Sequence, residues 1–128
     1  MHRIRLTILF MFFCVLSFTQ TIDILNFNSS TDYCPGSGVS VHINPTGVFT
    51  FENAGNLQDS ANNSFILEIS GAGGDWSNPT TLNTVYDFYT PLINGTLPAN
   101  LAAGDYQLRV RSTQPAVTSA STSTISVG

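Results

Sequence analysis

The sequence is poor in the residues that carry most protein chemistry. Charged residues make up 9% of the chain, lysine is absent, and two cysteines, two histidines and one tryptophan occur among 128 residues. A zinc site needs several His or Cys ligands at workable spacing, and a nucleic-acid-binding surface needs clustered positive charge. The composition therefore speaks against a zinc centre and against a nucleic-acid partner.

The first 19 residues form a segment of their own. A basic start at Arg3 and Arg5 precedes an apolar run from Leu6 to Leu16, and small polar residues follow it. This order predicts a secretory signal peptide over residues 1–19. The run is shorter than the about 20 apolar residues that a membrane-spanning helix needs. We therefore expect a secreted or cell-surface protein with no membrane span after signal cleavage.

Removing these 19 residues from 128 leaves 109, the size of one domain over residues 20–128. Two arginines stand against eight carboxylates in this part, a formal charge of −6. Once Cys14 is lost with the signal peptide, Cys34 has no partner for an intrachain disulfide, so stability must come from an apolar core. The favoured interpretation of Cys34 is a buried, inert thiol. The alternative is a disulfide to another molecule or to a part of the protein outside this sequence.

Short segments in which apolar and polar residues alternate follow one another along the rest of the chain, with Gly, Pro, Asn and Ser between them. Such segments predict β-strands separated by turns. The predicted strands are residues 22–27, 39–44, 49–51, 65–70, 82–89, 92–97, 106–111 and 125–127, with loops at 52–63 and 71–79. The pattern predicts an all-β fold, an immunoglobulin-like antiparallel β-sandwich of about 7 strands.

The clearest strand follows Gly104. Tyr106, Leu108 and Val110 fall on one face, while Arg109 and Arg111 fall on the other, which we expect to be solvated. A tyrosine that opens a strand just after the glycine of a turn also fits the corner tyrosine of immunoglobulin-like sandwiches, whose hydroxyl bonds back to the preceding backbone. A plain core aromatic is the alternative.

Five segments succeed one another in a characteristic order: Cys34-Pro35-Gly36, Phe65 to Ser70, Gly74 to Pro79, Leu97 to Val110, and Thr113 to Pro115. In this order they resemble the immunoglobulin-like modules of large cell-surface proteins in gliding and related Bacteroidota. The resemblance covers nearly the whole of residues 20–128.

The resemblance implies export by the general pathway and then by type IX secretion, and a role in adhesion or surface structure. It implies no catalytic residues and no cofactor. The implied partners are other modules of the same protein, or surface glycans and proteins. No C-terminal sorting domain follows Gly128, so we expect either the first module of a longer protein or an export route without the type IX step.

Candidate catalytic and metal-binding residues are sparse. His42 is the one histidine after signal cleavage, and no nucleophile motif accompanies it. Glu52 and Glu68 are placed as solvated charges rather than as a glycosidase pair. Asp59 and Asp75 lie in separate predicted loops without the ordered spacing of a calcium site. We therefore expect a non-enzymatic module, a structural spacer or adhesive unit.

The aromatic residues offer the best candidate binding site. Trp76, Tyr86 and Tyr89 are candidates for a platform that stacks against sugar rings, as in a carbohydrate-binding module attached to a polysaccharide-processing protein. The favoured alternative is packing, in which Trp76 closes the edge of the core and Tyr86 and Phe88 face inward.

One short motif indicates modification. Asp59-Ser60-Ala61 resembles the O-glycosylation acceptor of exported Bacteroidota proteins. It makes Ser60 a candidate glycosylation site within a predicted loop.

Overall fold

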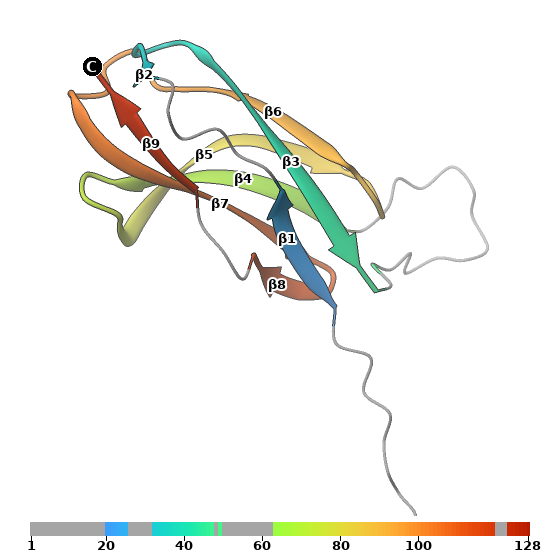
Figure 1. Ribbon diagram of the computed structural model, residues 1–128. Coiled ribbons are helices and arrows are strands. Elements are labelled where there is room, and N and C mark those ends of the chain that lie inside the picture. The colour runs from blue at the N-terminus through green and yellow to red at the C-terminus, as the bar shows by residue number, and fades with distance from the viewer. Residues whose placement is uncertain (1–19, 26–31, 48, 50–62, 120–122) are drawn as a thin grey trace, which may run out of the picture.

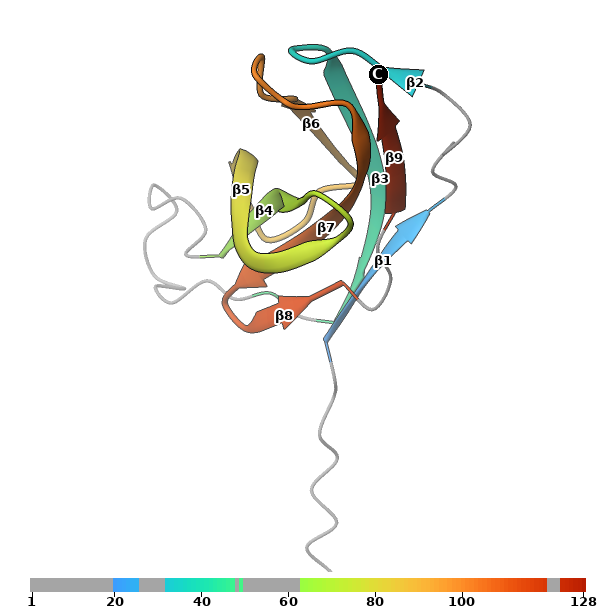
Figure 2. The same cartoon turned by 90° about the vertical axis from the view of Figure 1, so that its left-hand side faces the viewer.

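The computed structural model describes residues 20–25, 32–47, 49, 63–119 and 123–128, which form two β-sheets packed face to face (Figures 1 and 2). These residues contain nine strands and no helix. The strands are β1 (Thr21–Leu25), β2 (Asp32–Tyr33), β3 (Gly38–Thr46), β4 (Ser64–Gly71), β5 (Asp75–Tyr86), β6 (Leu92–Thr96), β7 (Gly104–Thr113), β8 (Ala116–Thr118) and β9 (Ser123–Val127). The all-β prediction is confirmed.

The strands are distributed between the sheets as in an immunoglobulin-like sandwich. One sheet has the order β1-β3-β6, and the other has the order β2-β9-β7-β4-β5, with β8 paired to β7. Successive strands change sheet after β1, β2, β3, β5 and β6, so neighbours in a sheet come from distant parts of the sequence. The predicted sandwich is thus confirmed. Two short strands, β2 and β8, are added to those expected, and Phe49, the described residue of the predicted strand 49–51, is not part of a strand.

One pairing departs from the antiparallel prediction. β2 lies parallel to β9, with Asp32 opposite Ser126 and Tyr33 opposite Val127. β2 belongs to the second sheet although β1 belongs to the first.

The core lies between the two inner faces. Val39, Val41 and Ile43 of β3 are buried and alternate with exposed residues, as the period-two pattern predicts. Phe65, Leu67 and Ile69 of β4 and Leu108 and Val110 of β7 come from the opposing sheet and belong to the same cluster. Phe49, the described part of the predicted strand 49–51, packs its ring on Phe65 with the ring centroids 5.2 Å apart.

Tyr106 is the predicted corner tyrosine. Its side chain is 5% exposed, and its hydroxyl donates a hydrogen bond of 2.8 Å to the carbonyl oxygen of Ala102. The ring contributes to the core while the hydroxyl fixes the turn that leads into β7. Both interpretations of this residue therefore hold at once.

The predicted loop 71–79 is wrong in extent. The turn covers only Gly71 to Gly74, and β5 begins at Asp75. Gly73 and Gly74 have positive φ angles of 71° and 82°, which glycine adopts readily, so the chain reverses tightly. Trp76 to Pro79 then lie opposite the single residue Ser70, because the pairing shifts there. Such a bulge on an edge strand tolerates proline.

The turn before β3 lies where the sequence predicts it, but the exposure of its first residue differs from the prediction. Ser37 N–H donates to the Cys34 carbonyl oxygen at 3.1 Å, and Gly36 has a φ of 79°, the pattern of a type II turn with Pro35 ahead of it. Cys34 is exposed. The interpretation of Cys34 as a buried thiol is therefore wrong, because the residue begins a surface turn instead of continuing an inward-facing strand.

Candidate functional site

Three charged side chains meet on the outer face of the six-stranded sheet, the face directed away from the core. The pairing of β4 with β7 sets Glu68 opposite Arg109 and Ile66 opposite Arg111. Residues opposite each other in adjacent strands project from the same face. The register thus gathers Glu68, Arg109 and Arg111 into one charged cluster.

Glu68 lies at the centre of the charged cluster. Its Oε2 accepts hydrogen bonds from Arg109 Nε at 3.0 Å and from Arg109 Nη2 at 2.9 Å, and its Oε1 accepts one from Arg111 Nε. The side chain of Glu68 is 4% exposed, against 22% for Arg109 and 37% for Arg111. Two guanidinium groups against one carboxylate leave a net positive charge at this site.

The prediction that Glu68 is a solvated charge is therefore wrong. Every residue of β4 from Ser64 to Ser70 is buried, on the outer face as well as the inner one. β4 lies between β5 and β7 in the sheet, so long side chains from both neighbours cover it. Arg109 and Arg111 are half-buried for the same reason, and each is paired with Glu68.

Trp76 extends the charged cluster onto β5. The Cζ atom of Arg109 lies 4.1 Å from the centroid of the Trp76 ring, a cation–π contact. Trp76 is half-buried, and one face of its ring is covered by the guanidinium. The side chain is therefore neither a core plug nor a fully open stacking surface.

The other aromatic candidates lie at the far end of β5. Tyr86 is 70% exposed, Phe88 50% and Tyr89 48%, so the interpretation in which Tyr86 and Phe88 face inward is wrong. Val85 packs against the core, and the alternation of the strand consequently turns Tyr86 outward. Trp76 and Tyr86 stand at opposite ends of β5, and the three candidates do not form a single platform.

The loop that carries Phe88 and Tyr89 is held by hydrogen bonds from Asp87 and Asn63. The Asp87 carboxylate accepts hydrogen bonds from the backbone N–H of Phe88 at 2.8 Å and of Tyr89 at 3.4 Å. The Asn63 side-chain amide donates to the Asp87 carbonyl oxygen at 2.9 Å. The exposed aromatic rings thus project from an anchored turn.

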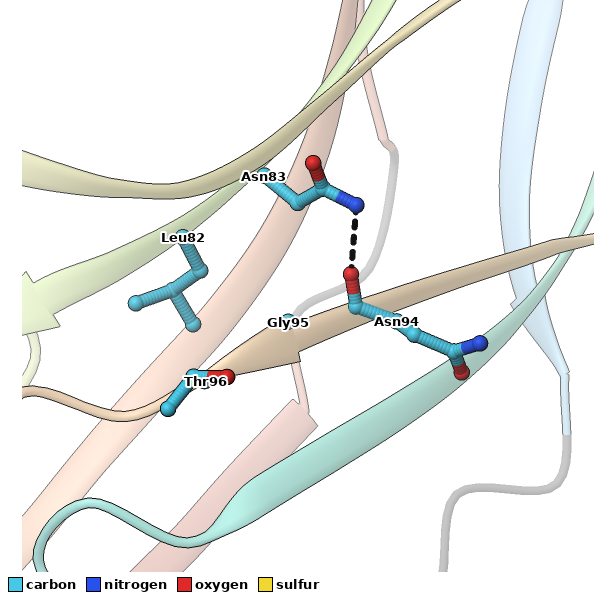
Figure 3. A pocket seen from close by; sticks show the side chains of 5 residues that line it. All are labelled: Leu82, Asn83, Asn94, Gly95 and Thr96. Atoms are coloured by element: carbon cyan, nitrogen blue, oxygen red, sulfur yellow. Dashed lines mark hydrogen bonds between the residues drawn. The ribbon is translucent and has the colours of Figure 1, made fainter.

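A hollow of about 310 Å³ lies where the edge strands of the two sheets face each other (Figure 3). It is lined by Leu82 and Asn83 of β5 and by Asn94, Gly95 and Thr96 of β6. The Asn83 amide donates a hydrogen bond of 2.6 Å to the Asn94 carbonyl oxygen and bridges the two strands. This edge hollow is near the lower limit of volume for small-molecule sites.

Sequence reasoning missed the edge hollow because its residues come from strands of different sheets. The signal within the sequence is Gly95. A Cβ atom there would lie 2.9 Å from Leu82 Cβ and 3.1 Å from Leu67 Cδ2. Glycine thus lets Leu82 pack closely over β6. A second, smaller hollow of about 190 Å³ is lined by Gly73, Gly74, Asp105, Tyr106, Gln107 and Thr124.

The remaining candidate residues lie apart from these features. His42 is exposed on β3, and Asp75 is exposed at the start of β5, where a hydrogen bond from the Ser77 backbone lowers the pKa of its carboxyl group. Glu52, Asp59 and the candidate glycosylation site Ser60 lie outside the described residues. Within the described ranges, no three or more His, Cys, Asp or Glu residues are grouped so that they could hold a metal ion.

Comparison with solved structures finds a distant match. No protein-family model matches the sequence, and no curated protein matches it. The structure of T. fusca AA10A is similar with a TM-score of 0.41 and 10% sequence identity, over 77% of this chain and 52% of that one. The chain thus spans about half the length of that structure. Among the described residues, no helix has the length and apolar character needed to cross a membrane.

Proposed function

We propose that this protein is a non-enzymatic module of an exported surface protein, acting as a structural spacer or adhesive unit. The observation that carries the proposal is the placement of the first and last strands. β1 starts at one end of the sandwich and β9 finishes at the other (Figures 1 and 2). Segments joined ahead of Thr21 and beyond Val127 would leave from opposite ends, which suits a unit that adds length between its neighbours.

The resemblance to immunoglobulin-like modules of Bacteroidota surface proteins supports this proposal. So does the signal-peptide pattern over residues 1–19, which predicts export of the rest of the chain. On this proposal its partners are other modules of the same protein or molecules of a neighbouring surface.

Cell fractionation tests this proposal. The protein is expressed from its own signal peptide in a Bacteroidota host with a small tag after Gly128, and intact cells are treated with protease. We expect the tag in the surface fraction and its removal by external protease. Retention in the cytoplasm, or hydrolysis of a test substrate that is lost on His42→Ala, would overturn it.

A carbohydrate-binding module is the second candidate. It is supported by the exposure of Tyr86 and Tyr89, since aromatic side chains with an open face stack on sugar rings, and by the amide groups that line the edge hollow. A glycan array tests it with the unmodified chain beside Tyr86→Ala, Tyr89→Ala and Trp76→Ala. Loss of a glycan signal in the tyrosine variants, with folding unchanged, is the expected result.

A further inference from the structure

Positive charge after residue 19 is confined to one place. Arg109 and Arg111 are the only arginines there, lysine is absent, and the same part of the sequence contains eight carboxylates. Both arginines lie in the charged cluster on the outer face of the six-stranded sheet. After Glu68 neutralises one of them, the cluster retains the charge needed to pair with a single anionic group.

Arg111 is the member of the charged cluster that is available to a ligand. Its Nε binds Glu68, and its terminal nitrogens have no hydrogen-bond partner among the residues that the structure describes. The side chain is 37% exposed, while Glu68 holds one side of the guanidinium in place. A fixed guanidinium with open terminal N–H groups is suited to bind a carboxylate in a bidentate fashion.

An exposed aromatic ring shares this face with Arg111. Ile66 of β4 is paired with Arg111 of β7 on one side and with Thr84 of β5 on the other. Two residues away along β4, Ser64 is paired with Tyr86 of β5. Strand spacing and rise per residue place the Cα atoms of Arg111 and Tyr86 about 12 Å apart. Tyr86 is 70% exposed, and Thr84 lies two residues before it on the same strand and face.

We propose that this face binds a polysaccharide containing uronic acid. The carboxylate of one sugar pairs with Arg111, and the ring of a nearby sugar stacks on Tyr86. This inference rests on the adhesive or carbohydrate-binding form of the proposed function and names its ligand class. Thr84, beside Tyr86 on β5, offers a hydroxyl to the bound polysaccharide.

The exposed ring of Tyr86 favours this ligand over other anions. The formal charge of −6 on residues 20–128 repels every polyanion, so a ligand needs a second contact besides its pairing with Arg111. A polysaccharide that contains uronic acid supplies both the carboxylate and a ring that stacks. An acidic peptide supplies the carboxylate without the sugar ring.

Calorimetric titration tests the inference on the chain after signal cleavage. The probes are a hexasaccharide of uronic acid and its carboxyl-reduced neutral counterpart. We expect the acidic probe to bind at least tenfold more tightly, with the preference reduced by added salt. Arg111→Ala should weaken binding of the acidic probe about tenfold, as expected for loss of one charged contact, and should leave the neutral probe unchanged.

Matched variants separate binding from folding. Arg111→Lys keeps the charge and most of the stem but loses the planar fork, and should retain part of the preference. Tyr86→Ala should weaken both probes, whereas His42→Ala, an exposed position on β3 in the other sheet, should weaken neither. Thermal unfolding of each variant shows that the sandwich remains folded.

Several outcomes would overturn the inference. It fails if the two probes bind equally, if Arg111→Ala keeps the acidic preference, or if a polyglutamate peptide binds as tightly as the acidic hexasaccharide. Neutral binding that depends on Tyr86 alone would refute the uronate site and retain a carbohydrate-binding module. Surface exposure of the protein without binding of any glycan would likewise refute the site and retain the spacer role.

Discussion

At the scale of single residues, Tyr106 and Gly95 show how individual atoms stabilise the sandwich. Tyr106 combines a buried ring with a hydroxyl that reaches the Ala102 carbonyl. Gly95 provides the space in which Leu82 packs over β6. Tyr106 acts through its hydroxyl oxygen, whereas Gly95 acts through the absence of a Cβ atom.

Tyr106→Phe should lower the free energy of unfolding by about 1 kcal/mol, because one hydrogen bond is lost while the ring stays in place. In a domain of this size the thermal midpoint should fall by about 5 °C. Tyr89→Phe is the control, since Tyr89 is 48% exposed and should unfold like the unmodified protein. Equal effects of the two variants in urea unfolding would contradict a structural role for the Tyr106 hydroxyl.

Gly95→Ala should destabilise the fold by about 1–3 kcal/mol, because the added methyl group forces Leu82 and Leu67 to move. Gly38→Ala is a matched control in a neighbouring strand, where the nearest atom to a new Cβ is a carbonyl oxygen 3.9 Å away. Urea unfolding compares the two. The close packing of Leu82 would be refuted if Gly95→Ala were as stable as Gly38→Ala.

At the scale of whole elements, β4 and β5 depart most from expectation. β4 has the alternating pattern of a half-buried strand, yet both of its faces are buried because β5 and β7 flank it. β5 begins seven residues before the predicted strand at Leu82, because a glycine turn reverses the chain tightly. A strand's position within its sheet therefore determines the environment of its outward side chains.

Glu68→Gln should lower the free energy of unfolding by about 2 kcal/mol, since it leaves two guanidinium groups facing each other without the carboxylate. This is below the cost for a fully buried ion pair, because both arginines are partly exposed. Arg111→Ala should cost less, as Arg109 still pairs with Glu68.

The control for this comparison is Asp23→Asn, an exposed carboxylate on β1, which should leave stability unchanged. Chemical denaturation of the three variants ranks their free energies of unfolding. A smaller loss for Glu68→Gln than for Arg111→Ala would show that the carboxylate is not the centre of the cluster.

At the scale of the whole molecule, a single apolar core between two sheets provides the stability. Its members come from both sheets and from strands far apart in the sequence. The cysteine that remains after signal cleavage, Cys34, lies on the surface. The free energy of unfolding should accordingly not depend on whether the solution is oxidising or reducing.

The thermal midpoint of residues 20–128 should be the same with and without a reducing agent, because no disulfide within the chain contributes to it. Cys34 should react with a thiol reagent in the folded state at close to the rate of an unhindered thiol. Cys34→Ser is the control for both measurements. Labelling that requires denaturant would contradict the exposed position of the thiol.

The sequence by itself determined the strand pattern, the sandwich and the corner tyrosine. Alternation along a strand is a local property that predicts its inward face. The glycine ahead of Tyr106 is likewise local and predicts the turn. Even so, local pattern could not place the start of β5 or show that Cys34 begins an exposed turn.

Only the tertiary structure decided which outward side chains are buried and which are open. Glu68 and Tyr86 both lie on the outer face of one sheet, but Glu68 is in a central strand covered by its neighbours, whereas Tyr86 ends an edge strand. The edge hollow likewise depends on two strands of different sheets coming together. These environments arise from contacts between distant segments, which a one-dimensional pattern does not contain.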